Sequence, residues 1–175
     1  MNVNKILDGL DRFEISVIEH SQSTLVSHLK GTHKILRNWS CPDYVCLAGL
    51  CHSIYGTESF LKYPVNLENR KYVQDLIGLE AEQLVYLFGV HKKNSLWENI
   101  DRSENFVLVD RLSEAIFKIT ESDLANLITL TLANWLEQRP AAGIENQQLR
   151  KNEFLRSKKY LPISAYAEFL KAYEI

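Results

Sequence analysis

The sequence contains little of what marks several classes of protein. It has only three cysteines, Cys41, Cys46 and Cys51, and their odd number and five-residue spacing fit neither a disulfide framework nor the C-x2-C spacing of a zinc site. Seven glycines and four prolines, beside 46% hydrophobic residues, argue against a disordered or repetitive chain. We therefore expect a single folded domain over residues 1–175, in a reducing compartment.

An excess of charge of one sign is also lacking. The 20 basic and 22 acidic residues give a formal net charge of −2, and no long block carries one sign. This excludes the electrostatic footprint of a protein that binds nucleic acid or an anionic membrane. No run of 18 apolar residues occurs, and the segment after Met1 has no apolar stretch typical of a secretory signal. We expect a cytoplasmic protein with a small-molecule substrate, of no indicated oligomeric state, that contacts neither nucleic acid nor membranes.

Apolar residues recur at steps of three and four along most of the chain, which predicts an all-α fold. The core is expected over residues 24–138, with C-terminal helices of residues 145–173 packed on it. Polar residues 92–104 have little periodicity and predict a surface loop. The expected helices cover residues 3–19, 24–36, 40–54, 68–76, 79–88, 120–138, 145–159 and 164–173.

One segment, residues 106–119, favours a small β-hairpin instead. Its two ends are β-branched and aromatic, and polar residues separate them. A helix through Leu112 and Ile116 is the alternative. Just after it, the series from Thr120 to Asp123 is a capping box that predicts the start of a long helix.

Capping residues predict three further helix boundaries. Ser40 is expected as an N-cap, with Pro42 and Asp43 in the first turn of the helix that follows. Gly56 and Gly89 are expected at helix ends, Gly56 in a left-handed conformation.

Two histidines are expected to face the same interior. His28 shares an apolar stripe with Leu25 and Leu29, whereas His33 lies about 140° further round the helix and should face water. His52 follows Ala48 at a helical step and turns towards His28 if the two helices form an antiparallel pair. The alternative interpretation of His28 is a core histidine that is hydrogen-bonded to a neighbour.

Two more polar residues are candidates for the same interior. Asn134 lies on the inner face of the helix over residues 120–138, where an unpaired amide would cost about 1–3 kcal/mol, so it must be bonded in the core or face a pocket. His91 is in line with Leu84 and Leu87 at the end of a helix. It could enter the interior or bind the last carbonyls of that helix.

Three segments together resemble the HD-domain superfamily of helical metalloproteins. They are His28-Leu29, Ala-Gly-Leu-Cys-His-Ser-Ile-Tyr-Gly-Thr over residues 48–57, and Leu-Ala-Asn-Trp-Leu over residues 132–136. The closer resemblance is to an uncharacterised bacterial family of HD-like domains. The superfamily resemblance implies a helical bundle in which His28 and His52 take the positions of two metal ligands, and Asn134 falls where the last ligand is expected.

The chain departs from the superfamily pattern at two of these positions. Ser53 stands where the superfamily has a bridging aspartate, and Asn134 where it has a terminal aspartate, and a hydroxyl and an amide are weak ligands for hard divalent ions. The resemblance then implies at most one divalent transition metal, Fe, Mn or Zn. His28 and His52 are the expected ligands, with His20, His91, Glu58 or Asn134 as helpers.

Three functions follow from these residues. The first is a metal-dependent enzyme, either a hydrolase of a phosphorylated or nucleotide-like substrate or a non-haem iron oxygenase. The second is a metal-free acid–base enzyme with His28 and His52 beside Tyr55, Glu58 and Asn134. The third is a degenerate HD-like binding or interaction module without catalysis.

The expected roles divide between two groups of residues. In the enzyme alternatives His52, Tyr55 and Glu58 are the candidate catalytic residues. Ser53, Thr57 and Asn134 are the candidate substrate-binding residues. A thiol nucleophile at Cys51 is disfavoured, because adjacent residues on a helix point about 100° apart and cannot form a bonded pair with His52.

Overall fold

The computed structural model describes residues 2–20, 23–143 and 146–175. Within them the fold is mainly helical, as expected, with two short pairs of antiparallel strands. The strands are β1 (Glu19–His20), β2 (Ser23–Thr24), β3 (Val107–Val109) and β4 (Ile116–Lys118). The helices are α1 (Val3–Leu10), α2 (Leu25–Asn38), α3 (Asp43–Cys51), α4 (Arg70–Ile77), α5 (Leu79–Val90), α6 (Lys93–Trp97), α7 (Glu121–Gln138), α8 (Lys151–Arg156) and α9 (Ile163–Ala172).

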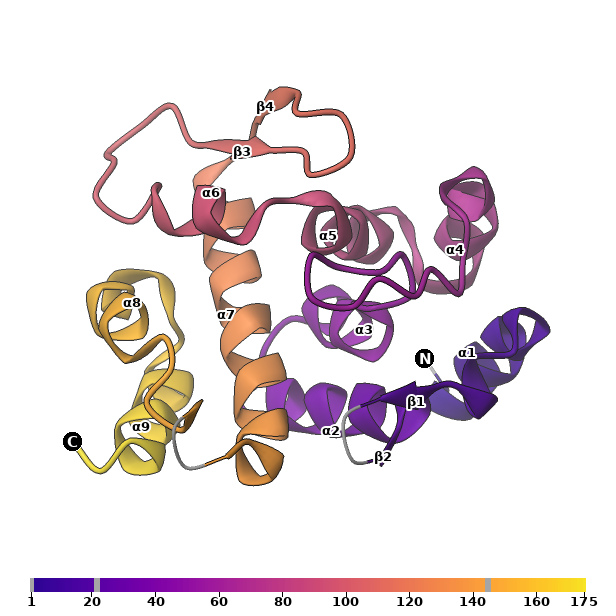
Figure 1. The fold of residues 1–175 in the computed structure, drawn as a ribbon, viewed down its shortest axis with the longest axis horizontal. Helices are drawn as coiled ribbons and strands as arrows, with labels where there is room; N and C mark the ends of the chain where they lie inside the picture. Colours follow the sequence, from indigo (N-terminus) through magenta and orange to yellow (C-terminus); the bar gives the residue numbers. More distant parts are fainter. Residues whose placement is uncertain (1, 21–22, 144–145) are drawn as a thin grey trace.

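Helix α3 lies at the centre of the molecule, between α2 and α5 (Figure 1). Its residues are almost all apolar, and every residue from Val45 to Cys51 is buried. A Cβ at Gly49 would collide with Leu36 of α2, so the glycine permits the close approach of these two helices. This approach brings the faces that carry His28 and His52 together.

Helix α7 packs against α2, α3 and α5, and it contacts α9 as well (Figure 1). The predicted capping box at its start is confirmed, because the hydroxyl of Thr120 accepts from the main-chain N–H of Asp123 at 3.0 Å and the carboxylate of Asp123 accepts from the main-chain N–H of Thr120 at 2.9 Å. Leu124, Leu127 and Ile128 are fully buried. The C-terminal half of the helix contacts His28 of α2 and His52, the residue that follows α3.

The predicted hairpin near residues 106–119 is confirmed. Strands β3 and β4 pair antiparallel with Leu108 opposite Phe117. The helical alternative through Leu112 and Ile116 is therefore wrong. Asn99 attaches the hairpin to the helical body, because its amide donates to Val107 O at 2.7 Å and accepts from Val107 N at 2.9 Å.

The expected helix over residues 3–19 is interrupted. Helix α1 ends at Leu10, and two short 3-10 turns follow, separated by Glu14 with a left-handed φ of 56°. An α-helix cannot continue through that conformation. The prediction that Ser40 caps α3 was also wrong: Ser40 has a φ of 57° in the turn that ends α2, and α3 begins only after Pro42.

Three boundaries near the middle and end of the chain differ from expectation. Residues 92–104 are not a plain surface loop, since they contain α6 and bury Leu96, Trp97 and Ile100. Helix α5 continues past Gly89, where a Cβ would lie 3.1 Å from the main-chain oxygen of Gly56, so this glycine serves a close contact rather than a helix end. Helix α8 is only six residues long, and the start of the expected helix at Glu145 lies outside the described residues.

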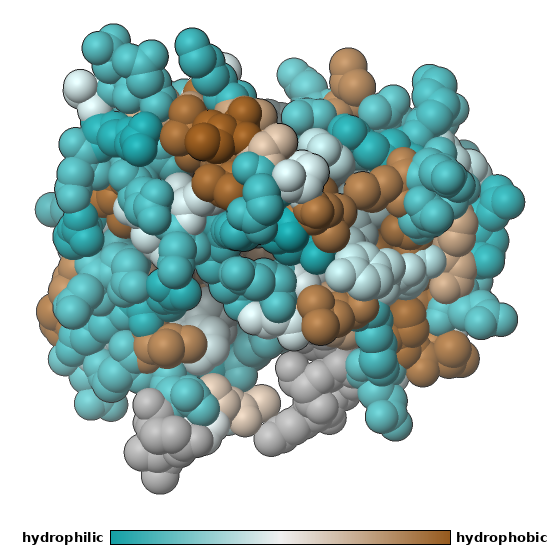
Figure 2. All heavy atoms as spheres, turned by 45° about the horizontal axis from the view of Figure 1, so that its top comes forward, coloured by the Kyte–Doolittle hydropathy of each residue, from teal (hydrophilic) through white to brown (hydrophobic). Residues whose placement is uncertain are grey.

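Exposed hydrophobic side chains form separate patches among hydrophilic ones on the face that Figure 2 shows. The large hydrophobic side chains that are most exposed in the described part of the chain are Ile163, Val17 and Ile116. None of the described helices combines the length and the apolar character that a membrane crossing requires.

Candidate functional site

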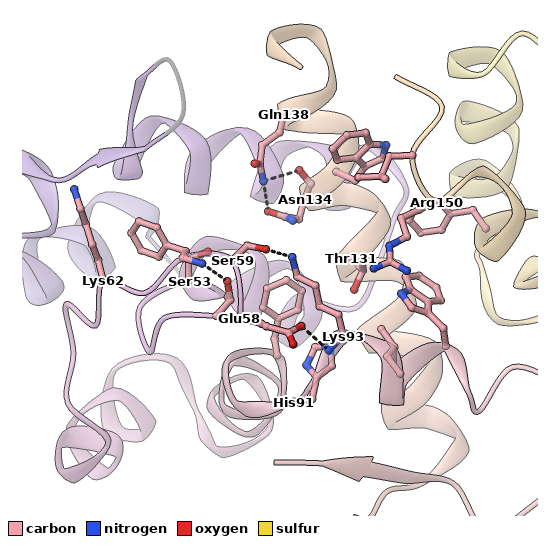
Figure 3. Close-up of a pocket in the computed structure, with 18 of the residues that line it drawn as sticks. Ser53, Glu58, Ser59, Lys62, His91, Lys93, Thr131, Asn134, Gln138 and Arg150 are labelled. Atoms are coloured by element: carbon pink, nitrogen blue, oxygen red, sulfur yellow. Dashed lines mark hydrogen bonds between the residues drawn. The ribbon is translucent and has the colours of Figure 1, made fainter. Parts of the chain in front are cut away.

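A cavity of about 500 Å³ opens beside the C-terminal half of α7. Its walls come from the turn after α3, from α5, α6 and α7, and from the start of α8 (Figure 3). Five of the expected site residues line it: Ser53, Thr57, Glu58, His91 and Asn134.

The two central histidines lie directly behind the wall of this cavity. His28 is 1% exposed and His52 is fully buried, and their Nε2 atoms are 3.0 Å apart. The side chain of Asn134 connects them to the cavity, because its Oδ1 lies 2.9 Å from His52 Nε2 while the residue lines the wall. The expected pairing of His28 and His52 next to Asn134 is confirmed as geometry.

The Nδ1 atom of each ring is held by an acceptor. His52 Nδ1 is 2.9 Å from the main-chain oxygen of Gly49, which can only accept, so this nitrogen carries the hydrogen. His28 Nδ1 is bonded to the carboxylate of Glu137. Both rings are therefore fixed by Nδ1, and their Nε2 atoms are directed towards one another.

Helix α7 supplies two residues to this arrangement that the sequence analysis did not identify. Glu137 holds His28, and Gln138 donates from Nε2 to Asn134 Oδ1 at 2.8 Å. The signal was available, since residues three and four positions after Asn134 share its face of a helix. The amide of Gln138 also supports the orientation of Asn134 in which Oδ1, and not Nδ2, faces His52.

Tyr55 does not face the histidines, contrary to expectation. Its hydroxyl donates to the fully buried carboxylate of Glu82 at 3.0 Å, and Arg70 binds both oxygens of that carboxylate, at 2.7 and 2.9 Å. Burial and the nearby Glu82 charge raise the pKa of Tyr55. Tyr55 is absent from the cavity wall, so it belongs to a buried ion-pair network and not to the candidate site.

His91 lines the cavity but does not join the histidine pair. Its Nδ1 donates to the oxygen of Leu87 at 2.9 Å, as in the carbonyl-binding alternative, and burial lowers its pKa. The ring of Phe88 packs edge-on against both His52 and His91, with centroids 5.0 and 6.0 Å away. In the part of the chain that the structure describes, no three His, Cys, Asp or Glu side chains are grouped to hold a metal ion, and His91 Nδ1 is bonded to Leu87 and not to His28 or His52.

Of the remaining expected residues, Glu58 lies at the rim of the cavity and Ser53 lies in its wall. Glu58 is exposed at the rim and accepts from the main-chain N–H of Lys93 at 3.0 Å, and the Thr57 hydroxyl accepts from the N–H of Phe60 at 3.1 Å. Ser53 is 3% exposed and lines the wall next to His52. The side chain of His20 lies outside the described residues.

His33 and Cys51 have structural roles. His33 does not face open water as expected, since it is half-buried and its Nδ1 is 2.8 Å from the main-chain oxygen of Cys46. Burial raises the pKa of Cys51 to about 12, which keeps it a thiol and agrees with its exclusion as a nucleophile.

Comparisons with known proteins reach only part of this arrangement. A protein-family model described as "Domain of unknown function (DUF6817)" matches residues 10–93, slightly less than half of the chain. The match includes His28 and His52 but ends before Asn134 and Glu137. No curated protein and no solved structure matches the chain. The chain is thus similar over its N-terminal half to a family whose function is unknown.

Proposed function

We propose that this chain is an HD-like small-molecule enzyme in which His28, His52 and Asn134 hold one divalent transition metal, Fe, Mn or Zn. The observation that carries the proposal is the convergence of their acceptor atoms. Both imidazoles donate from Nδ1, which leaves the two Nε2 atoms as acceptors 3.0 Å apart, with Asn134 Oδ1 beside them at 2.9 Å. A metal ion or a proton among these three atoms would satisfy the geometry, and we propose the metal ion.

The donor set fits a transition metal. Imidazole nitrogens bind such ions at about 2.0–2.1 Å, and the 3.0 Å between the two Nε2 atoms would let one ion reach both. Histidine ligands commonly donate their other N–H to a carboxylate or a main-chain carbonyl, the roles that Glu137 and the Gly49 oxygen have here. The amide of Asn134 would be the weakest of the three ligands.

A divalent ion at this position would supply a Lewis acid that polarises a substrate oxygen and activates water. The protein's own residues would bind and orient the substrate. Ser53 and Asn134 face the cavity where a substrate would bind, and Glu58 places a carboxylate at its rim. Hydrolysis of a phosphorylated or nucleotide-like substrate is the reaction that the HD resemblance suggests, and oxygenation is the second form.

The composition supports a small-molecule substrate and a cytoplasmic location for this proposed activity. The nearly balanced charge favours a small-molecule substrate over nucleic acid, and three buried free thiols suit a reducing cytoplasm.

Metal analysis tests the proposal. Protein purified without chelator should contain about one equivalent of Fe, Mn or Zn, and chelated protein should bind one of them again. His52→Gln should lose this binding, whereas Asn134→Asp should strengthen it, because a carboxylate replaces a neutral amide. His33→Gln is the matched control, since His33 bonds Cys46 and not the pair. Absence of bound metal together with no affinity for the three ions would refute the proposal.

A metal-free acid–base enzyme is the second candidate, and one specific observation favours it. Glu137, His28 and His52 form a continuous chain of hydrogen bonds if a proton, not a metal ion, lies between the two Nε2 atoms. Such a chain could deliver a proton to the cavity through His52. Activity that survives exhaustive chelation but is lost in His52→Gln would select this candidate.

The degenerate binding module is the third outcome of the same experiments. Ser53 and Asn134 in place of two aspartates support it. Ligand binding that persists in His52→Gln, with neither metal affinity nor activity in the unaltered protein, would assign this function.

A further inference from the structure

Two cationic side chains, those of Lys93 and Arg150, line the cavity. Lys93 is the first residue of α6, and Arg150 immediately precedes α8. Figure 3 shows the Lys93 ammonium directed at Ser59 and the Arg150 side chain near Thr131 of α7, both in the wall of the same cavity. They come from segments nearly 60 residues apart, and the fold brings both to the wall of one cavity.

The two charges are only partly compensated by the protein. Lys93 Nζ donates to the neutral hydroxyl of Ser59, while the carboxylate of Glu58 is bonded to the Lys93 main chain. Arg150 bonds Glu153 at 3.0 Å, with both side chains 28% exposed. Burial and the Arg150 charge lower the pKa of Lys93, whereas Glu58 raises it. An anion between Lys93 and Arg150 would relieve this repulsion between like charges.

The backbone at Arg150 has an unfavourable conformation. Its φ of 63° and ψ of 12° are left-handed, a conformation that costs a residue with a side chain about 1–2 kcal/mol. The guanidinium lies 5.7 Å from the centre of the Trp97 ring, over its face. Of the six described non-glycine residues with a positive φ, Arg150 is the one that lines the cavity.

The wall next to these cations is aromatic. Trp97 and Phe154 both line the cavity and pack edge-to-face, with ring centroids 5.4 Å apart. Phe88 extends this apolar wall towards His52. A ligand that fits must combine an apolar body with an anionic end.

We propose that Lys93 and Arg150 form an anion subsite that binds the carboxylate or phosphate of a small aromatic acid. The aromatic body of the acid then lies along Trp97 and Phe154, and its reacting end points to Ser53 and Asn134. The inference rests on the proposed function, because it assigns a substrate class to the same cavity.

Binding of simple probes to chelated protein tests the subsite. Benzoate and phenyl phosphate should bind and change the tryptophan fluorescence, since Trp97 and Trp135 line the cavity, and benzyl alcohol should bind far more weakly. Lys93→Gln and Arg150→Gln should each weaken binding of the acids by about tenfold or more, the loss expected for one charge-assisted hydrogen bond. Arg156→Gln is the matched control, because Arg156 lies on α8 but bonds Asp101, and it should bind as the unaltered protein does.

Arg150→Gly keeps the experiment decisive if the glutamine variant folds poorly. Glycine adopts a φ of 63° without strain, so this variant should be at least as stable and still lose binding of the acids. The inference is overturned if neither acid binds at millimolar concentration, if benzyl alcohol binds equally, or if the variants retain affinity. Whichever acid binds more tightly identifies the anionic group. Metal binding by the same variants should be unchanged, so failure of the subsite is distinguishable from failure of the metal site.

Discussion

The effect of Gly31→Ala on the free energy of unfolding should change sign with the residue at position 137. Gly31 lies in the middle of α2, three residues after His28. A Cβ there would be 2.7 Å from Glu137 Cγ and 2.8 Å from its Oε1. These separations are too short, so Gly31→Ala must push the carboxylate of Glu137 away from His28.

The magnitude follows from two opposing effects. Alanine stabilises a helix interior by about 0.8–1.0 kcal/mol relative to glycine. Displacement of Glu137 removes a bond to an almost fully buried histidine, and a hydrogen bond to a charged group contributes about 1.5–3 kcal/mol. Gly31→Ala should therefore destabilise the unaltered protein by about 0.5–2 kcal/mol. In a Glu137→Ala background it should instead stabilise by about 1 kcal/mol.

Urea unfolding of the four proteins of this double-mutant cycle, with chelator present, measures the coupling. Gln138→Ala is the control background, because Gln138 neighbours Glu137 but bonds Asn134, and there Gly31→Ala should remain destabilising. Equal effects of Gly31→Ala with and without Glu137 would refute the packing of Glu137 between Gly31 and His28.

Three further predictions concern the surroundings of the site. Gly78→Ala should lower the free energy of unfolding by about 1–3 kcal/mol because of its φ of 90° alone, since a Cβ there would meet no atom within 4 Å beyond its chain neighbours. Gly56→Ala should lower it at least as much, because its Cβ would be 2.9 Å from the main-chain oxygen of Lys62. Thermal unfolding of the two variants measures both effects. Burial lowers the pKa of His91 below 6.5, so the unfolded chain binds more protons than the folded protein below that pH. The free energy of unfolding should therefore fall as the pH drops from 6.5 towards 5. A His91→Gln variant whose stability fell equally with pH would contradict the role of His91 in this dependence. Burial raises the pKa of Cys41 to about 11 and of Cys51 to about 12, so a thiol reagent at pH 8 should modify them quickly only in denaturant, and rapid reaction of the native protein would count against their burial.

The parts of the site that depend on one helix were predictable from the sequence. His28 and Asn134 lie on the inner faces that their apolar neighbours define, and the Thr120 capping box fixed the start of α7. The partner of each side chain could not be predicted in the same way, because Glu137 and His28 are 109 residues apart in the sequence. A periodic pattern gives the face of a helix but not which helix it meets.

Departures from expectation arose where the backbone adopts a left-handed conformation at a residue other than glycine. Glu14 ends the first helical region early, and Ser40 takes such a conformation where a cap was expected. These residues show no local preference for that conformation, so tertiary packing decides it. The misplaced Tyr55 has a different cause. Its hydroxyl donates to Glu82 of α5, a helix that lies outside the motif around His52.

One turn at the end of α7 carries Asn134, Glu137 and Gln138, and it thereby touches both histidines and the cavity. Each residue added to or removed from the preceding part of α7 would rotate this turn by about 100° relative to α2 and α3. All three contacts would be lost in a single step. Sequences related to this chain should therefore tolerate changes of length in the loops around α7 but keep the number of residues between its capping box and Asn134 constant.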